Sequence, residues 1–518
     1  MNTGRSSVIL VSRASSLDHV LQTNNPPSDN EVEEIQILIQ DIKECMEAQD
    51  RFEDPDVHDF EPHTREQLKD LNSACRSALS PLRRFPAEII SYIFSQIMRG
   101  IYEFADEGWM SLNTTKEPWT FAQVCGWWRT VALAHQEIWS YVRIDMEALK
   151  TNRTPEPSLA ALQCCLQRSG AHTLSIHFTD SYPPTTRTKE LFSALVPHCR
   201  QWKVVTFSVF FEHLELLVTA RGNLRSLQSL TLIAYGTERS SNLDVFEIAP
   251  QLRDVSLGID ITYTQLSLPW PQLTKIIGWR AIDLSFLHHA TSLEGCSLTF
   301  SPFHIFPAVV SPIRIPSLRR LRLDTEYPLD GLAAPALEDL GISSIYMRAT
   351  ALQHITSFVH RSSCSLRSLL LHDMTIDSEF VIMPLLDSIP SLAFLQVKRG
   401  QVDWNELVRV LTITKTRRLV PNLKVIRFIF DINLELQPDF EPSLLLDMIE
   451  SRFYQAGTDA ATNLESITLL EVDEPLPEQC MARLAKLEEQ GLKVADDTRP
   501  EEDVPSVVSW AAWDGIMN

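Results

Sequence analysis

The chain has 518 residues, of which 44% are apolar, and this content favours a packed structure over a disordered one. Its formal net charge of −21 argues against general nucleic-acid binding, which requires a basic footprint. No apolar run approaches the roughly 18 residues of a membrane helix, and the run at residues 8–11 is too short for a signal peptide. The nine cysteines form no CxxC pair. We therefore expect a cytoplasmic or nuclear protein with reduced thiols and no membrane contact.

The first elements that we expect are acidic amphipathic helices over residues 29–80, after a flexible N-terminus of residues 1–28. Ser28 and Glu31 form a capping box ahead of the first apolar stripe. Two stripes recur at helical spacing on either side of a break at residues 52–62: Val32, Ile35, Ile39, Ile42 and Met46, then Leu68, Leu71, Cys75 and Leu79. The pattern predicts a helical hairpin or a short coiled coil, which either packs on its own domain or mediates self-association.

Residues 82–97 read LRRFPAEIISYIFSQI and predict a helix with Pro86 in its first turn. Its apolar residues form two adjacent rows: Ile89, Ile93 and Ile97, and next to them Ile90 and Phe94. After a polar insert at residues 99–118, a second apolar stretch follows at residues 119–144. Three short helices in about 65 residues bury little core of their own, so we expect a partner to complete this unit.

Two stretches of this unit resemble the F-box, in the form abundant in fungi: Pro86-Ala-Glu-Ile-Ile-Ser-Tyr-Ile-Phe94, then Val124-Cys-Gly-Trp-Trp-Arg129 with Ile138-Trp139. Phe85 stands where the family usually has leucine, and the insert lengthens the gap between the two stretches. The resemblance implies that residues 81–145 bind the Skp adaptor of a Skp–cullin–F-box ubiquitin ligase through large apolar side chains. Ten residues are assigned to this interface by resemblance: Phe85, Pro86, Ile89, Ile90, Ile93, Phe94, Val124, Cys125, Trp128 and Trp139. Each of them lies either in that interface or in the small core of the unit.

Residues 146–494 repeat a pattern in which apolar residues follow a leucine at three and five positions. Clear copies begin at Leu227, Leu293, Leu318, Leu337, Leu366 and Leu392. The leading positions of the array lie 19 to 31 residues apart, and six of them read Pro-x-Leu. Helical stretches lie between the copies at residues 211–218, 351–362, 404–413 and 443–453. This period and pattern are the signature of a leucine-rich-repeat solenoid.

We therefore expect an α/β protein, with an N-terminal helical region and a three-helix F-box followed by a leucine-rich-repeat-like solenoid with a parallel sheet. The asparagine that usually follows each strand is missing, so the repeats are divergent and their number and curvature stay open. Two packed sheets or a barrel would be the structural alternative. Residues 478–494 predict a closing helix and strand. Residues 495–518 predict an acidic flexible tail, which carries Trp510 and Trp513.

A basic group occupies strand positions that should face away from the helices. Most such positions hold small or polar residues, but four hold cations on an otherwise acidic chain: Arg320, Arg322, Lys398 and Arg427. One interpretation is a binding site for an acidic or phosphorylated segment of a protein target. The other is a solvated face that Asp324 and Asp339 balance.

Motifs of enzymatic chemistry are absent, since the sequence holds no GxxxxGK[ST], GxGxxG, GxSxG or HExxH. His288 and His289 are adjacent, and on a strand they would point to opposite faces, which prevents shared metal ligation. We expect no catalytic residue, no metal ligand and no cofactor.

The sequence thus favours a non-catalytic substrate receptor, in which the F-box binds the Skp adaptor, and through it a cullin, while the solenoid binds a protein target. The alternative is a repeat scaffold or ligand-binding protein in which residues 82–144 cap the solenoid. The face with Ile90 and Phe94 separates the two hypotheses. A receptor predicts that this face is exposed in the isolated chain, whereas a cap predicts its burial against residues 170–210.

Overall fold

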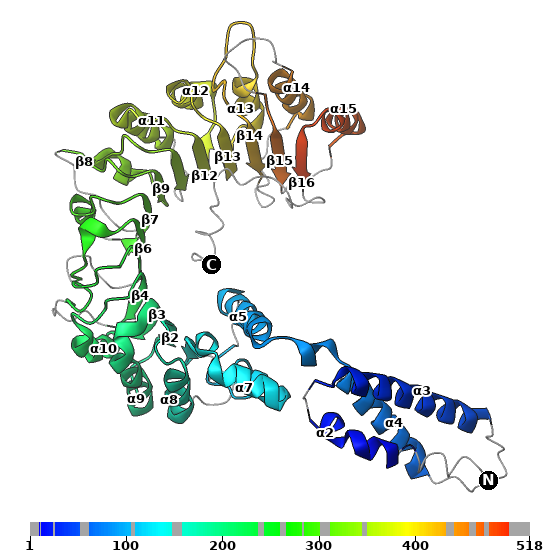
Figure 1. Ribbon diagram of the computed structural model, residues 1–518. Helices are drawn as coiled ribbons and strands as arrows, with labels where there is room; N and C mark the ends of the chain where they lie inside the picture. The colour runs from blue at the N-terminus through cyan, green and yellow to red at the C-terminus, as the bar shows by residue number, and fades with distance from the viewer. Residues whose placement is uncertain are drawn as a thin grey trace. The chain divides into compact units, whose positions relative to one another are not determined.

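The computed structural model describes residues 10, 12–23, 26–51, 62–104, 109–147, 158–236, 243–258, 266–281, 284–300, 311–343, 350–430, 440–454, 463–470 and 476–496. Over these residues the chain is an α/β protein with one long parallel sheet (Figure 1). It divides into two compact units, residues 1–180 with 184–205, and residues 181–183 with 206–518.

The first unit begins with a small helical bundle: η1 (Ser15–Leu17), α2 (Asp18–Leu21), α3 (Asp29–Arg51) and α4 (Pro62–Ala78). Glu31 reaches back to Ser28 as predicted, since its carboxylate accepts the backbone N–H and the hydroxyl of Ser28 at 2.7 and 2.6 Å. The two stripes pack on each other, with Ile35 and Leu68 fully buried. Val20, from the segment assigned to a flexible N-terminus, is buried in the same cluster. The hairpin therefore packs on its own domain, and the break at residues 52–61 lies outside the described residues.

A second helical group follows: η2 (Pro81–Arg84), α5 (Ala87–Phe104), α6 (Phe121–Val124), α7 (Gly126–Ala134) and η3 (Gln136–Trp139). Arg83 ties η2 to the bundle, because its guanidinium donates to the carbonyl oxygen of Val20 at 2.8 Å. The core of the group is aromatic: the ring of Phe94 stacks on Phe121 with centroids 4.3 Å apart and meets Trp128 edge-on at 5.1 Å.

The sheet has fourteen strands, and every pairing whose register is described is parallel. In order across the sheet they are β1 (Tyr141–Asp145), β2 (Leu174–Asp180), β3 (Trp202–Phe210), β4 (Ser229–Tyr235), β5 (Asp254–Gly258), β6 (Lys275–Ala281), β7 (Gly295–Phe300), β9 (Arg320–Leu323), β11 (Asp339–Ser343), β12 (Ser368–Ile376), β13 (Phe394–Val402), β14 (Val425–Ile429), β15 (Ser466–Leu470) and β16 (Lys493–Asp496). Two short strands, β8 (Ile313–Arg314) and β10 (Leu332–Ala333), pair separately. The order runs from β1 to β16 without closing, so the barrel alternative is wrong.

Helices connect the strands, as parallel pairing requires. They are α8 (Leu159–Arg168), α9 (Thr186–Leu195), α10 (Phe211–Leu214), α11 (Ala351–Ser362), α12 (Glu379–Ser388), α13 (Trp404–Leu411), α14 (Pro442–Phe453) and α15 (Glu478–Glu489). Shorter 3₁₀ helices serve elsewhere: η5 (Val196–Gln201), η6 (Glu215–Ala220), η8 (Trp270–Gln272), η9 (Ser285–His288) and η10 (Tyr327–Gly331). The predicted helices at 351–362, 404–413 and 443–453 are confirmed, and Figure 1 shows α11 to α15 on one side of β12 to β16.

The repeated apolar residues align across the sheet. Leu340, Leu369 and Leu395 occupy one register in β11, β12 and β13, and Ile426 and Ile467 continue it in β14 and β15. All five are at most 1% exposed. They face the helices, since Trp404 of α13 lies 5.3 Å from Phe428, which shares their side of the sheet. The positions predicted from the repeat therefore form the core in these strands.

Candidate functional site

The two apolar rows of α5 have different environments. Ile90, Phe94 and Met98 are buried, at 2%, 0% and 0% exposure. Ile89 and Ile97, from the adjacent row, are 47% and 41% exposed, and Ile93 between them is half-buried. The row that begins at Ile90 therefore belongs to the core, whereas the row that begins at Ile89 lies on the surface.

The burial of Phe94 arises within its own helical group, because its ring packs on Phe121 of α6 and Trp128 of α7. The receptor hypothesis predicted that the face with Ile90 and Phe94 is exposed, and this expectation is wrong. The cap hypothesis predicted burial against residues 170–210, and the ring contacts of Phe94 do not match that expectation either. Residue spacing placed both rows on one wide apolar face but could not rank them.

The second stretch divides in the same way. Val124, the last residue of α6, is 60% exposed, and Trp127 in α7 is 37% exposed. Cys125 has a structural role: its sulfur accepts a hydrogen bond from the backbone N–H of Trp128 at 3.3 Å and so caps α7. Trp128 itself is half-buried.

Trp139 is buried, so its assignment to the adaptor interface is not supported. Its indole N–H donates to the carbonyl oxygen of Ala132 at 2.8 Å. The guanidinium of Arg168, from α8, lies 4.4 Å above the Trp139 ring and 5.1 Å above the Trp119 ring. Trp139 therefore joins the helical group to the helix that follows β1.

Of the ten residues that the sequence assigned to the adaptor interface, Ile90, Phe94 and Trp139 are buried, and the others keep some exposure: Phe85, Pro86, Ile89, Ile93, Val124, Cys125 and Trp128. Sequence reasoning missed Tyr92, which is 63% exposed, and Trp127. We call five exposed residues of this region the exposed apolar surface: Ile89, Tyr92, Ile97, Val124 and Trp127.

A partly buried polar network joins α5 to η3. The Ser95 hydroxyl donates to Glu137 at 2.7 Å and lies 2.7 Å from Nε2 of His135. Burial alone would raise the pKa of the Glu137 carboxyl, but hydrogen bonds from Ser95 and Arg99 hold it below its ordinary value. The carboxylate contacts the serine and not the far ring nitrogen of the histidine, so this is not the geometry of a nucleophilic triad. The network holds the two helices together.

The basic group divides into two parts, because β11, β12 and β13 separate β9 from β14. In the first part, Nε of Arg320 lies 3.8 Å from the carboxylate of Asp339 in β11. Burial raises the pKa of Asp339 to about 6. Asp324 does not pair with these arginines, since its carboxylate accepts the backbone N–H of Phe300 at 3.0 Å. For Arg320, these contacts fit the interpretation of a solvated face on which a nearby aspartate, Asp339, balances the charge of the arginine.

The second part contains Lys398 in β13 and Arg427 in β14. Arg427 donates to the side-chain oxygen of Gln396 at 3.3 Å, and its guanidinium lies 5.7 Å from the Phe394 ring. Apolar residues occupy neighbouring outward positions, so we call this the basic-apolar face: Leu370, Phe394, Lys398, Val425, Arg427 and Ile429. None of the outward positions that align across β12 to β15 between Ser368 and Leu470 is a carboxylate.

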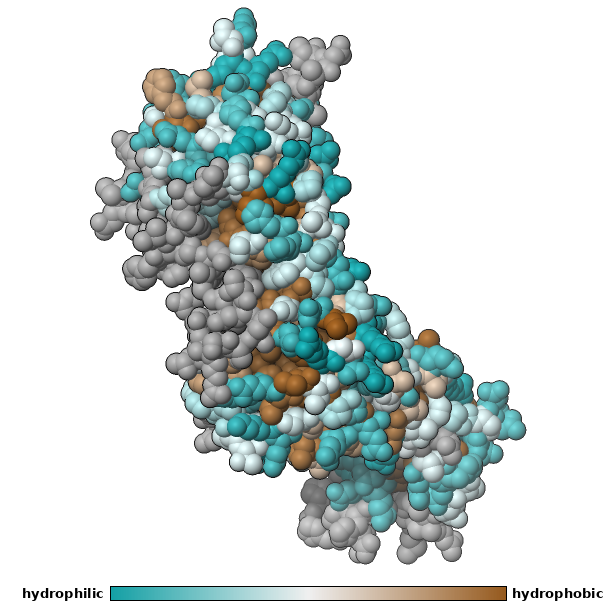
Figure 2. Space-filling view, turned by 90° about the vertical axis from the view of Figure 1, so that its left-hand side faces the viewer, coloured by the Kyte–Doolittle hydropathy of each residue, from teal (hydrophilic) through white to brown (hydrophobic). Residues whose placement is uncertain are grey.

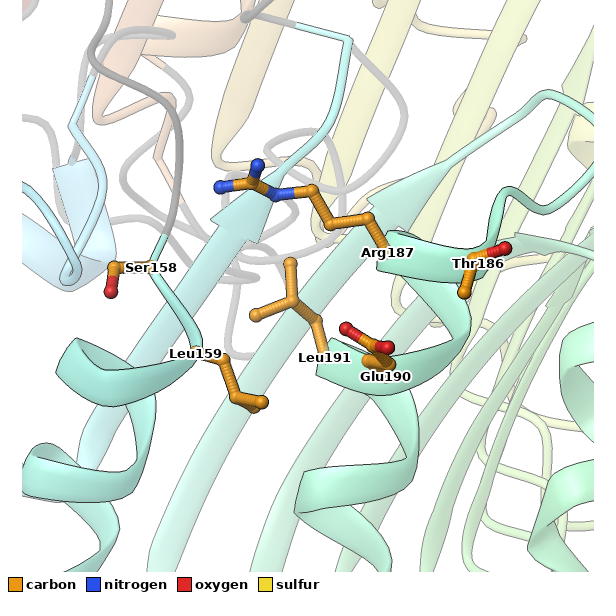
Figure 3. A pocket seen from close by; sticks show the side chains of 6 residues that line it. All are labelled: Ser158, Leu159, Thr186, Arg187, Glu190 and Leu191. Atoms are coloured by element: carbon orange, nitrogen blue, oxygen red, sulfur yellow. The ribbon is translucent and has the colours of Figure 1, made fainter.

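A pocket of about 340 Å³ lies where α8 and α9 begin (Figure 3). Leu159 and Leu191 contribute from the two helices, and the Arg187 side chain extends from α9 toward α8. Arg187 and Glu190, which also line the pocket, carry opposite charges. No motif of the sequence pointed to this pocket.

The surface shown in Figure 2 is mainly hydrophilic, with hydrophobic residues in separate patches. Within the described residues, no helix has both the length and the apolar content to cross a membrane. No group of three His, Cys, Asp or Glu side chains among these residues is arranged to hold a metal ion. His288 and His289 are exposed at the end of η9, not on a strand as expected.

No family model matches the chain, and no curated protein matches it either.

Proposed function

We propose that this chain is a substrate receptor of a Skp–cullin–F-box ubiquitin ligase. In this proposal residues 81–145 are an F-box that binds the Skp adaptor, and the repeats form a divergent leucine-rich-repeat solenoid that binds a protein target. The chain itself performs no chemistry, and its role is to bring a target close to the catalytic subunits. The observation that carries the proposal is the exposed apolar surface on α5, α6 and α7.

Two features of this surface favour a protein partner. Ile89 and Ile97 are close to half exposed. Exposing large aliphatic side chains to water is unfavourable, and a partner that covers them would remove this cost. Trp127 and Tyr92 add aromatic side chains, the residue type enriched where protein interfaces gain most affinity. The aromatic core of Phe94, Phe121 and Trp128 fixes the backbone beneath, so the surface is formed before a partner binds.

The alternative function, a repeat scaffold that residues 82–144 cap, has its own supporting observation. Arg168 of α8 stacks on Trp139 and Trp119, so the end of the helical group covers the first connecting helix. The two roles use different residues, because Trp139 faces α8 while Ile89 and Ile97 remain exposed. Capping by Trp139 therefore does not exclude adaptor binding by α5.

The test is co-expression of the chain with a Skp adaptor, followed by co-purification and titration. We expect a stoichiometric complex with the wild type. Each buried isoleucine contributes about 1.5–3 kcal/mol, so the double variant Ile89→Asp with Ile97→Asp should bind at least about 100-fold more weakly. Both positions are on the surface, so the variant should keep its helical circular dichroism.

Ile37→Asp is the matched control, since Ile37 is 52% exposed on α3, outside the exposed apolar surface. It makes the same isoleucine-to-aspartate change, once instead of twice, on an exposed helix and should leave adaptor binding unchanged. If folded wild-type chain does not bind the adaptor, the ligase proposal is wrong, and the scaffold function becomes the better one.

A further inference from the structure

The basic-apolar face is largely shielded from solvent although it lies opposite the helices. Leu370, Phe394, Val425 and Ile429 are 7%, 9%, 5% and 9% exposed. Alternation along the strands places them on the side away from Leu369, Leu395 and Ile426, which face the helices. Apolar side chains therefore gather on the side of the sheet away from α11 to α15, which is suited to binding an apolar ligand.

The charge on this face is positive. Lys398 and Arg427 stand on adjacent strands, and His372 occupies the position in β12 that aligns with Lys398. The nearest carboxylate on β12, that of Asp373, accepts a hydrogen bond from Ser343 of β11 at 3.1 Å and so is directed away from β13. A ligand for this face should therefore combine acidic groups with large apolar ones.

The residues that follow β16 have this composition. Residues 497–503 read DTRPEED, with four acidic residues against one arginine, and residues 504–514 read VPSVVSWAAWD, with Trp510 and Trp513. We call residues 497–514 the acidic-aromatic segment. They lie outside the described residues, which end at Asp496 in β16.

The acidic-aromatic segment begins close enough to the basic-apolar face to reach it. Asp496 aligns with Leu469 of β15, which aligns with Phe428 of β14 and Val397 of β13. Strands are about 4.8 Å apart, so Arg427 and Lys398 lie roughly 10 and 15 Å from the start of the acidic-aromatic segment. Seven extended residues span up to about 25 Å, which is enough to bring Glu501, Glu502 and Asp503 to both cations.

We propose that the acidic-aromatic segment binds in cis to the basic-apolar face, with its carboxylates at Lys398 and Arg427 and its tryptophans over the apolar residues. Lys398 and Arg427 are two of the four cations interpreted as a target-binding site, so the segment occupies this part of the site until a target displaces it. This regulatory consequence rests on the proposed function, whereas the intramolecular contact does not.

The contact is tested in the full chain by replacing Trp510 with the photoreactive residue p-benzoylphenylalanine. After irradiation, mass spectrometry maps the cross-linked peptides. We expect them to fall mainly within residues 368–376, 394–402 and 425–429. Reversing the charges with Lys398→Glu and Arg427→Glu should lower the yield at least fivefold, and raising the salt concentration should lower it in the wild type.

The matched control is Lys415→Glu with Lys486→Glu, which changes the net charge by the same amount at two exposed lysines away from this face. This control should leave the cross-linking yield unchanged. Cross-links to other parts of the chain, or equal losses in both double variants, would overturn the proposal. A yield that rises with protein concentration would show that the segment binds a second copy, which also overturns it. A failure of Skp binding would leave this outcome unaffected.

Discussion

The helical group of residues 81–139 and strands β9 to β14 each carry candidate binding residues, but only in the strands could spacing assign their faces. Side chains on a strand alternate, so the burial of Leu321 and Leu323 places Arg320 and Arg322 on the other side. On α5 two apolar rows lie side by side, and either could have been the core. The choice depends on Phe121 and Trp128, which are distant in sequence. The buried face of an element can therefore be predicted when polar residues occupy its other face, and not merely when the element contains many apolar residues.

The two regions also differ in how the surroundings of a carboxyl group shift its pKa. Glu137 in the helical group accepts hydrogen bonds from Ser95 and Arg99, which keep its pKa below the ordinary value despite burial. Asp339 in β11 has Arg320 nearby, but burial dominates and raises its pKa to about 6. The difference lies in hydrogen bonding: two donors offset burial at Glu137, whereas at Asp339 the arginine lies 3.8 Å away.

The largest effect should come from the buried row of α5. Phe94→Ala removes a fully buried ring from an aromatic cluster, so it should lower the free energy of unfolding by about 3–5 kcal/mol. Ile89→Ala on the exposed row should cost less than about 1 kcal/mol. Urea denaturation followed by circular dichroism measures both. Equal losses for the two variants would show that the rows of α5 are assigned wrongly.

The next effect concerns the buried carboxyl of the strands. The pKa of Asp339 is about 6 in the folded chain against an ordinary 3.8, so the folded state binds the proton more tightly. Its contribution to stability is complete below pH 3.8 and is lost as the pH rises through 6. Asp339→Asn should therefore raise the free energy of unfolding at pH 7 by about 1–2 kcal/mol, less than the full shift implies because the contact with Arg320 weakens.

Thermal or urea unfolding between pH 4 and 7 measures this effect. The variant should show a smaller loss of stability over this range than the wild type. Asp324, whose pKa burial also raises to about 6, keeps part of the slope in both proteins. An unchanged slope in Asp339→Asn would mean that the carboxyl of Asp339 does not titrate in this window.

Much of the fold followed from the sequence, because the repeat fixes the inward positions: Leu340, Leu369 and Leu395 stand in adjacent strands as their spacing predicts. The contact of Glu31 with Ser28 was also predictable, because it depends only on residues that are close in sequence. The division of the basic group also follows from the repeat, because the copies that begin at Leu337, Leu366 and Leu392 lie between Arg322 and Arg427 and form the three strands between them. The burial of Val20 was not predictable, because its stripe is short and its partners lie in α3 and α4. Local periodicity predicts helices and strands. Which of two apolar faces is buried, and which distant segments are in contact, can be seen only in the three-dimensional structure.

The smallest effect tests the boundary between core and surface in the helical group. Cys125 was assigned to adaptor binding, but its sulfur caps α7 by accepting the backbone N–H of Trp128. Cys125→Ala removes this acceptor and should cost about 0.5–1 kcal/mol, whereas serine, a preferred capping residue, should restore the stability. Urea denaturation measures both, and Cys125→Ser should also keep adaptor binding. If serine costs as much as alanine, then it is the apolar packing of the sulfur, not its hydrogen bond, that stabilises this turn.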